Sequence, residues 1–253
     1  MKAKRHVKRN RRDVAPVVVM KDAARSFGTR DVLTGLNVRI LPGEVVGVVG
    51  PNGGGKSTLL LLMAGLLRPT AGQVLVCGIE AYALSLNCAG RVGLVTARPG
   101  LYPLLTGREN LWHFGGLFGL SPSEVDEKSE PLIRALRLTA GIDERVGRLS
   151  TGMQQKLSLI RALLLSPQLL LFDEPTANLD PVAARALYAE VRTRADAGLA
   201  CVLATHDLAG AEAVCDRVLL VDGGVKRRVR FTEQRAAPTG PLYTAWQEAI
   251  GDR

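Results

Sequence analysis

The chain has 253 residues and an apolar content of 47%, which is enough for one or two domains with a substantial core and excludes a disordered chain. Its formal net charge of +9 would, taken alone, indicate binding to nucleic acid or to an anionic membrane surface. Seven of the 33 basic residues, however, fall within the first twelve positions, so residues 13–253 carry 26 basic and 24 acidic side chains. The excess charge therefore belongs to a basic tail over residues 1–14, and the body is nearly neutral.

The sequence contains no segment that we expect to cross a bilayer. Its longest apolar run, residues 59–67, is far shorter than the ~18–20 residues that a spanning helix needs. The basic tail is not followed by an apolar region, so we expect no secretory signal. The four cysteines, at positions 77, 88, 201 and 215, lack C-x-x-C spacing, which favours reduced, buried thiols over zinc ligands or disulfides.

Short apolar runs separated by turn residues extend over residues 15–225. The run at 45–49 is continuous and β-branched, which is typical of a strand buried on both faces of a sheet. A helix is expected over residues 56–67. Strands are expected at residues 17–20, 36–40, 45–49, 73–76, 92–95, 169–172, 201–205 and 218–221. This alternation predicts an α/β core.

Residues 98–165, between two of these strands, have a helical pattern instead. Thr106 to Glu109 and Ser121 to Glu124 both fit the S/T-x-x-E capping box, and the second has a proline at the first helical position. We therefore expect a helical insertion in the α/β core. Residues 226–253 form a C-terminal extension in which no motif is recognisable.

Residues 50–58 fit the phosphate-binding pattern G-x-x-x-x-G-K-[ST], in the expected context of a preceding apolar strand and a following helix. Glycines allow successive backbone N–H groups to converge on nucleotide phosphates, and the helix N-terminus adds its positive dipole. Lys56 would bridge the β- and γ-phosphates, and the Ser57 hydroxyl would bind Mg²⁺. Nucleotide binding is assigned to Gly50, Asn52, Gly53, Gly54, Gly55, Lys56, Ser57 and Thr58.

A second acidic motif follows the apolar strand at 169–172. It places Asp173 at the carboxyl end of a core strand, where open α/β sheets bind ligands. Asp173 would hold Mg²⁺, and Glu174 would act as the general base toward an attacking water. A surface turn before Pro175 is the alternative interpretation, but it explains neither the acidic pair nor the strand in front of it.

With these motifs, the sequence from about residue 17 to 225 resembles the nucleotide-binding subunit of an ABC (ATP-binding cassette) transporter. Leu149 to Gln155 resembles the L-S-G-G-Q signature, and Phe27 matches the aromatic residue that stacks on adenine in the family. Asp180 lies in the D-loop position and His206 in the H-loop position. The order and spacing of all these motifs agree with the family.

The resemblance implies a P-loop cassette with a RecA-like core, an antiparallel β subdomain and a helical subdomain. It implies two cassettes paired head to tail, with each ATP held between the phosphate loop of one chain and Ser150 and Gly152 of the other. Asp180 would communicate across that interface, and His206 would contact the γ-phosphate and position the water with Glu174. The implied partner is a separate transmembrane permease, which would hold the chain at the cytoplasmic face of the membrane.

Two departures from the family pattern are visible. Thr151 and Met153 give the signature an S-T-G-M form, which resembles cassettes of small exporters and favours export over import. The family's Q-loop glutamine is replaced by Ala97, so its role falls to water, to Arg98 or to nothing.

Several questions stay open at the level of the sequence. An apolar set after residue 99 either receives the permease or packs the helical insertion; it comprises Tyr102, Leu104, Leu105, Leu111 and Trp112. Residues 2–12 either bind anionic headgroups, at about 1 kcal/mol per cation near the surface, or are a solvated extension. A soluble ABC ATPase acting on nucleic acid or ribosomes is less favoured because this sequence has neither a second cassette nor a long coiled coil between the two nucleotide motifs. A P-loop kinase is less favoured because the signature, D-loop and H-loop motifs are all present. No nucleic-acid partner is expected.

Overall fold

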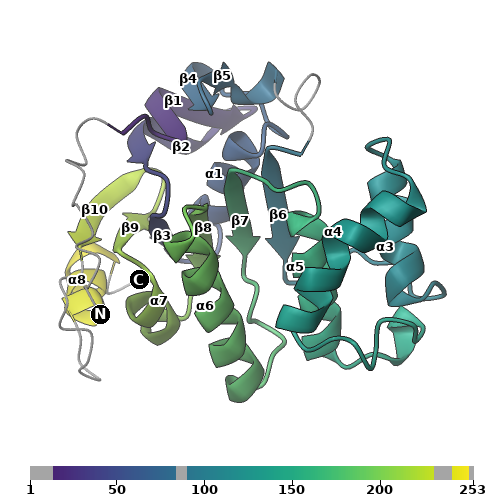
Figure 1. Ribbon diagram of the computed structural model, residues 1–253. Coiled ribbons are helices and arrows are strands. Elements are labelled where there is room, and N and C mark those ends of the chain that lie inside the picture. Colours follow the sequence, from purple (N-terminus) through teal and green to yellow (C-terminus); the bar gives the residue numbers. More distant parts are fainter. Residues whose placement is uncertain (1–13, 84–89, 231–240, 251–253) are drawn as a thin grey trace, which may run out of the picture.

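The computed structural model describes residues 14–83, 90–230 and 241–250. The predictions for residues 2–12 and for Cys88 lie outside this part of the chain. The described residues form two sheets with helices between and beside them, and a group of helices stands to one side (Figure 1).

The first sheet is antiparallel and contains the N-terminal hairpin. Its order is β2-β1-β4-β5. The strands β1 and β2 extend well beyond the predicted runs at 17–20 and 36–40. Gly28, at φ +59°, allows a tight turn after which Arg30 pairs with Phe27, so the two strands continue to the tip of the hairpin. The strands are β1 (Val18–Phe27), β2 (Arg30–Ile40), β4 (Ala71–Val76) and β5 (Ile79–Glu80).

The second sheet is parallel except at one edge, in the order β10-β9-β3-β8-β7-β6. Alternate residues of its strands face opposite sides. Val46 and Val48 pack toward the antiparallel sheet, whereas Val45 and Val49 pack toward the helices on the other face. The strands are β3 (Val45–Val49), β6 (Val92–Thr96), β7 (Leu169–Asp173), β8 (Ala200–Thr205), β9 (Arg217–Val221) and β10 (Val225–Arg230).

The helix α1 (Lys56–Met63) lies between the two sheets, and its leucines fill the core that they share. It ends before the predicted limit at residue 67. Gly65, at φ +72°, ends the helix and comes so close to the carbonyl of Ala81 that a Cβ there would lie only 2.0 Å from that oxygen. The opposite face of the parallel sheet is covered in part by α6 (Pro181–Asp196) and α7 (Leu208–Val214).

Between β6 and β7 the chain forms α3 (Gly107–Gly116), α4 (Pro122–Ala135), the 3-10 turn Val146–Arg148 and α5 (Thr151–Leu163). Both predicted capping boxes are confirmed. The hydroxyls of Thr106 and Ser121 accept from the backbone N–H three residues on. In return, the carboxylates of Glu109 and Glu124 accept from the backbone N–H of Thr106 and Ser121.

Residues 226–230 and 241–250 belong to the fold, although the sequence showed no motif there. The edge strand β10 pairs with β9, and Leu242 and Ala245 of α8 (Pro241–Ile250) are buried in the helical-side core.

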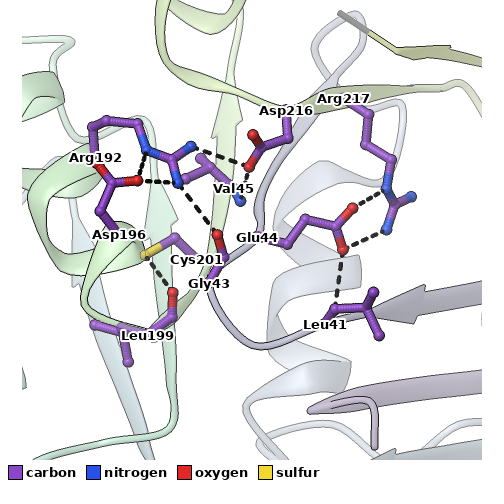
Figure 2. Close-up of polar contacts among 10 residues, drawn as sticks. All are labelled: Leu41, Gly43, Glu44, Val45, Arg192, Asp196, Leu199, Cys201, Asp216 and Arg217. Carbon is purple, nitrogen blue, oxygen red and sulfur yellow. Dashed lines mark hydrogen bonds and ion pairs between the residues drawn. The ribbon is translucent and has the colours of Figure 1, made fainter. Parts of the chain in front are cut away.

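Two ion-pair networks tie the start of β3 to the rest of the fold (Figure 2). Glu44 pairs with Arg217 of β9 at 2.7 Å and accepts a hydrogen bond from the Leu41 N–H. On the other side, Arg192 of α6 donates to Asp216 and to the carbonyl of Gly43. Residues 41–44, which join β2 of one sheet to β3 of the other, are therefore held by paired charges. They lie at the end of the parallel sheet opposite the carboxyl ends of its parallel strands.

The described cysteines agree with the expectation of reduced thiols, since none forms a disulfide and Cys201 and Cys215 are buried. Burial raises the pKa of Cys201 to about 12. The described part of the chain also contains no helix with the length and apolarity that spanning a membrane requires.

Candidate functional site

The phosphate loop joins β3 to α1, and close packing makes its glycines necessary. A Cβ on Gly50 would lie 2.1 Å from the carbonyl oxygen of Val221. Gly55 has φ +101°, and a Cβ there would lie 2.6 Å from Leu33. The loop is thus folded against β2 and β9 in a conformation that only glycine adopts without strain.

Lys56 is the first residue of α1 and is only 7% exposed. Its ammonium group donates to the carbonyls of Gly50 (2.9 Å) and Pro51 (3.2 Å) and lies 3.8 Å from Oε1 of Glu174. The loop therefore wraps around a buried positive charge, which favours an anionic ligand.

Asp173 ends β7, next to the start of α1. Burial raises the pKa of its carboxyl group, and the negative charge of Glu174 adds to the shift, whereas a hydrogen bond from Ser57 and the charge of Lys56 oppose it. Its Oδ1 atom is buried and has no hydrogen-bond partner among the described residues. A buried, unpartnered carboxylate oxygen beside a serine hydroxyl fits the oxygen ligands that Mg²⁺ prefers.

Glu174 and His206 follow neighbouring strands, β7 and β8. Glu174 adopts φ +48°, an unusual backbone conformation for a residue other than glycine, and its N–H donates to the carbonyl of Ala204. Its Oε2 atom lies 2.9 Å from Nδ1 of His206. The carboxylate therefore stands between a lysine and a histidine, which suits proton abstraction from a nearby water.

Phe27 lies at the end of β1 and is 46% exposed. The guanidinium of Arg25 lies 4.4 Å from the centre of the Phe27 ring. Arg30, which pairs with Phe27 across the hairpin, extends toward the phosphate loop, where its guanidinium would lie 3.9 Å from a Cβ on Gly53. The hairpin tip, with its exposed aromatic ring, thus lies beside the phosphate loop.

Three other predicted residues take helix-capping or close-packing positions at the starts of α5 and α6. Ser150 caps α5, and its hydroxyl accepts from the N–H of Met153. Asp180 caps α6 through two backbone N–H groups, which lower the pKa of its carboxyl group. A Cβ on Gly152 would contact Ala183 of α6 at 3.6 Å. The signature segment therefore lies against α6.

Comparison with known proteins identifies the family. A protein-family profile described as ABC transporter matches residues 33–177. The chain belongs to the ABC transporter family. It is 36% identical over 203 residues to the Nod factor export ATP-binding protein I of Rhizobium etli, covering 80% of this chain and 64% of that protein. It is 37% identical over 213 residues to the protein of that name from Burkholderia lata, covering 84% and 70%. The chain thus spans about two thirds of the length of these relatives.

Solved structures agree with this assignment. An ATP-binding subunit of an ABC transporter has a TM-score of 0.78 at 30% identity, covering 90% of this chain and 98% of that one. A dimeric cassette in a post-hydrolysis state, bound to ADP and Pi, has a TM-score of 0.75 at 27% identity, covering 85% and 99%. The predicted fold class, an α/β P-loop cassette with an antiparallel sheet and a separate helical part, is confirmed.

In this ABC cassette, backbone groups make the contacts at the position of the missing Q-loop glutamine. The N–H of Ala97 donates to the carbonyl of Asp173 at 2.9 Å, and its carbonyl accepts from the side-chain amide of Asn178 at 3.2 Å. The amide of Gln155 donates to the carbonyl of Thr96. Neither Asn178 nor Gln155 was predicted to contact this loop, because nothing local in the sequence shows which loop their amides reach.

The apolar set after residue 99 divides between the two interpretations. Leu111 is 1% exposed and packs in the helical core, so it cannot line a surface groove. Tyr102 and Leu104 are 47% and 78% exposed. Neither lines the nearby cavity of about 580 Å³ between the loop at 97–103 and the start of α5, but their sequence neighbour Pro103 does, together with Ala97 and Gln154 among others.

Proposed function

We propose that this chain binds ATP with Mg²⁺ and hydrolyses it, and that it powers export through separate transmembrane subunits. The observation that carries the proposal is the contact of Glu174 with both Lys56, at 3.8 Å, and His206, at 2.9 Å. Asp173 directly precedes Glu174, and its buried, unpartnered Oδ1 atom supports a metal site beside the phosphates.

The chemistry follows from the character of these groups. The Lys56 ammonium and the loop N–H groups would hold the β- and γ-phosphates and stabilise negative charge as it develops. Glu174 would accept a proton from a water that attacks the γ-phosphorus, while the bond to the β-phosphate oxygen breaks and ADP leaves. His206 would orient Glu174 and the water. Mg²⁺, held by Ser57 and Asp173, would supply charge neutralisation on the phosphate oxygens.

The test uses Glu174→Gln, which keeps the shape of the side chain but removes the base. We expect the wild-type protein to hydrolyse ATP and the variant to lose about a hundredfold or more of that activity. The matched control is Glu127→Gln, because Glu127 is an exposed residue of α4 outside the site. A wild-type protein without ATPase activity, or a fully active Glu174→Gln variant, would contradict the proposal.

A head-to-tail pair of cassettes is the second part of the proposal. Ser150 caps α5 and Gly152 lies against α6, whereas Lys56 is held by Gly50, Pro51 and Glu174. Ser150 and Gly152 would therefore bind the γ-phosphate that the other chain holds. The dimeric ADP-bound cassette described above supports this arrangement. With ATP, the Glu174→Gln variant should elute at the mass of a dimer and return to a monomer when ATP is removed. Elution as a monomer at saturating ATP would contradict pairing.

Export with a permease at the cytoplasmic face of the membrane is the third part. It is supported by the S-T-G-M signature and by relatives whose names describe export ATP-binding proteins. Tyr102 and Leu104 offer exposed apolar side chains to such a partner. The pairing predicts a neighbouring gene that encodes a protein with about six spanning helices. Co-purification of that protein with this chain would test the pairing.

Residues 2–12 would add attraction to anionic lipid through their seven cations. A variant lacking these residues should bind vesicles containing anionic lipid more weakly at low salt, and the difference should disappear at high salt. Equal binding at low salt would leave the segment without a lipid role.

A further inference from the structure

Behind the Glu174–His206 contact, a buried tyrosine joins the same two loops a second time. Tyr188 belongs to α6 and is 8% exposed. Its hydroxyl lies 3.1 Å from Oγ1 of Thr176 and donates to Oδ2 of Asp207 at 3.1 Å. Thr176 is two residues after Glu174, and Asp207 directly follows His206. The two loops therefore have one contact between their catalytic side chains and another through Tyr188.

The direction of the hydrogen bonds from Thr176 through Tyr188 to Asp207 follows from the bond to Asp207. Tyr188 donates its single hydroxyl proton to Asp207, so it can only accept from Thr176, whose hydroxyl is the donor. Burial raises the pKa of Tyr188 to about 12, so its hydroxyl keeps its proton at neutral pH. The other oxygen of Asp207 accepts from the N–H of Gly210 at 2.9 Å and so anchors the start of α7. Linked bonds of this kind strengthen one another in a dry environment.

The ring of Tyr188 is held in place by close packing. A Cβ on Gly210 would lie 2.4 Å from Cε2 and 2.6 Å from the hydroxyl oxygen, so α7 approaches the ring as closely as a glycine permits. The packing of α6 against the first turn of α7 therefore helps to set the position of the hydroxyl.

We propose that Tyr188 is a positioning residue, whose hydroxyl sets the spacing between Glu174 and His206. The inference rests on the proposed ATPase function. The two catalytic side chains need such support, since Glu174 has a strained backbone at φ +48° and His206 is 68% exposed. Without the Tyr188 hydroxyl, the Thr176 and Asp207 ends of the two loops would lose their common partner.

The kinetic test uses Tyr188→Phe, which keeps the ring and removes only the hydroxyl. We expect kcat for ATP hydrolysis to fall about ten- to a hundredfold, because small displacements of catalytic groups are costly, with KM for ATP within twofold of wild type. Thr176→Val should behave like Tyr188→Phe, the double variant should fall no further, and Thr176→Ser should keep the wild-type kcat. An unchanged kcat in Tyr188→Phe would overturn the proposal.

A matched control separates positioning from loss of stability. Val191 is 1% exposed on the same helix and makes no part of the hydroxyl chain. Val191→Ala should lower the unfolding temperature of the protein but keep kcat. If Val191→Ala lowers kcat as much as Tyr188→Phe, the tyrosine acts through stability alone and the proposal is wrong.

A readout without catalysis distinguishes this proposal from the proposed function. In Tyr188→Phe, the amides of residues 174–179 and 206–210 should exchange with deuterium faster than in Val191→Ala. Unchanged exchange in these two segments would overturn the coupling. A wild-type protein that hydrolyses no ATP would refute the ATPase function, while the exchange rates would still decide whether Tyr188 joins the loops.

Discussion

The Nδ1 atom of His206 lies 2.9 Å from Oε2 of Glu174, although 32 residues separate the two in the sequence. The contact joins the ends of two adjacent parallel strands, β7 and β8. It places the histidine on the opposite side of the carboxylate from Lys56, which approaches Oε1.

This geometry predicts that His206→Ala lowers kcat for ATP hydrolysis about a hundredfold or more, with KM for ATP nearly unchanged, since the phosphate loop stays intact. Because the two side chains act as a unit, Glu174→Gln combined with His206→Ala should be no slower than Glu174→Gln alone. Steady-state kinetics of the three variants measure this, and independent, multiplicative losses would argue against a shared role.

Asp173→Asn should stabilise the protein in the absence of Mg²⁺ while removing Mg²⁺-dependent hydrolysis. Burial raises the pKa of this carboxyl group, so the folded protein resists its ionisation. The folded state then holds a proton that the unfolded chain has released, and stability falls as pH rises from the ordinary pKa through the raised one. We expect a gain of about 0.5–2 kcal/mol at neutral pH, measured by thermal unfolding with a chelator present. If Asp173→Asn is less stable than the wild type under these conditions, the ionised Asp173 does not destabilise the folded protein and the prediction is wrong.

Gly55→Ala should destabilise the phosphate loop more than Gly53→Ala does. Both glycines have positive φ, +101° and +79°, so an alanine at either pays the left-handed backbone cost of about 1–2 kcal/mol. A Cβ on Gly55 would also meet Leu33 at 2.6 Å, whereas one on Gly53 would meet only Arg30 at 3.9 Å. Overpacking adds about 1–3 kcal/mol at Gly55, and unfolding in urea measures the difference. Equal losses would mean that Leu33 moves aside freely.

Glu44→Gln should destabilise the protein by about 3 kcal/mol, because it leaves Arg217 without the carboxylate that neutralises it. The two side chains are 12% and 10% exposed, respectively. The control is Glu130→Gln, which breaks a pair with Arg134 whose side chain is 71% exposed and should cost less than about 0.5 kcal/mol. Urea unfolding of both variants gives the comparison, and similar small losses would show that the Glu44 pair is well solvated.

Much of the candidate site was predictable because its chemistry lies in consecutive residues. The phosphate loop, the acidic pair at the end of β7 and the histidine after β8 are short motifs whose strands and turns form locally. The capping boxes of α3 and α4 were predictable for the same reason, since each joins residues three apart.

The rest depended on contacts between distant segments. Asn178 reaches Ala97 across 81 positions, and Arg217 reaches Glu44 across 173. Local patterns cannot show such partners, because the position of a side chain depends on how whole strands and helices pack. For the same reason the sequence left the fate of Leu111 open and gave no sign that Leu242 is buried in the core.

By itself, the sequence indicated the family and the fold class through the order and spacing of its motifs, and both are confirmed. It also predicted which residues would meet phosphate, because backbone freedom at glycine and the charges of lysine and carboxylates are properties of local chemistry. Only the tertiary structure decided that Glu174 contacts both Lys56 and His206, and that Tyr188 bridges the loops behind them. The physical reason is that hydrogen bonds and ion pairs require approach within a few ångströms, and the packing of the two sheets and α6 sets that approach.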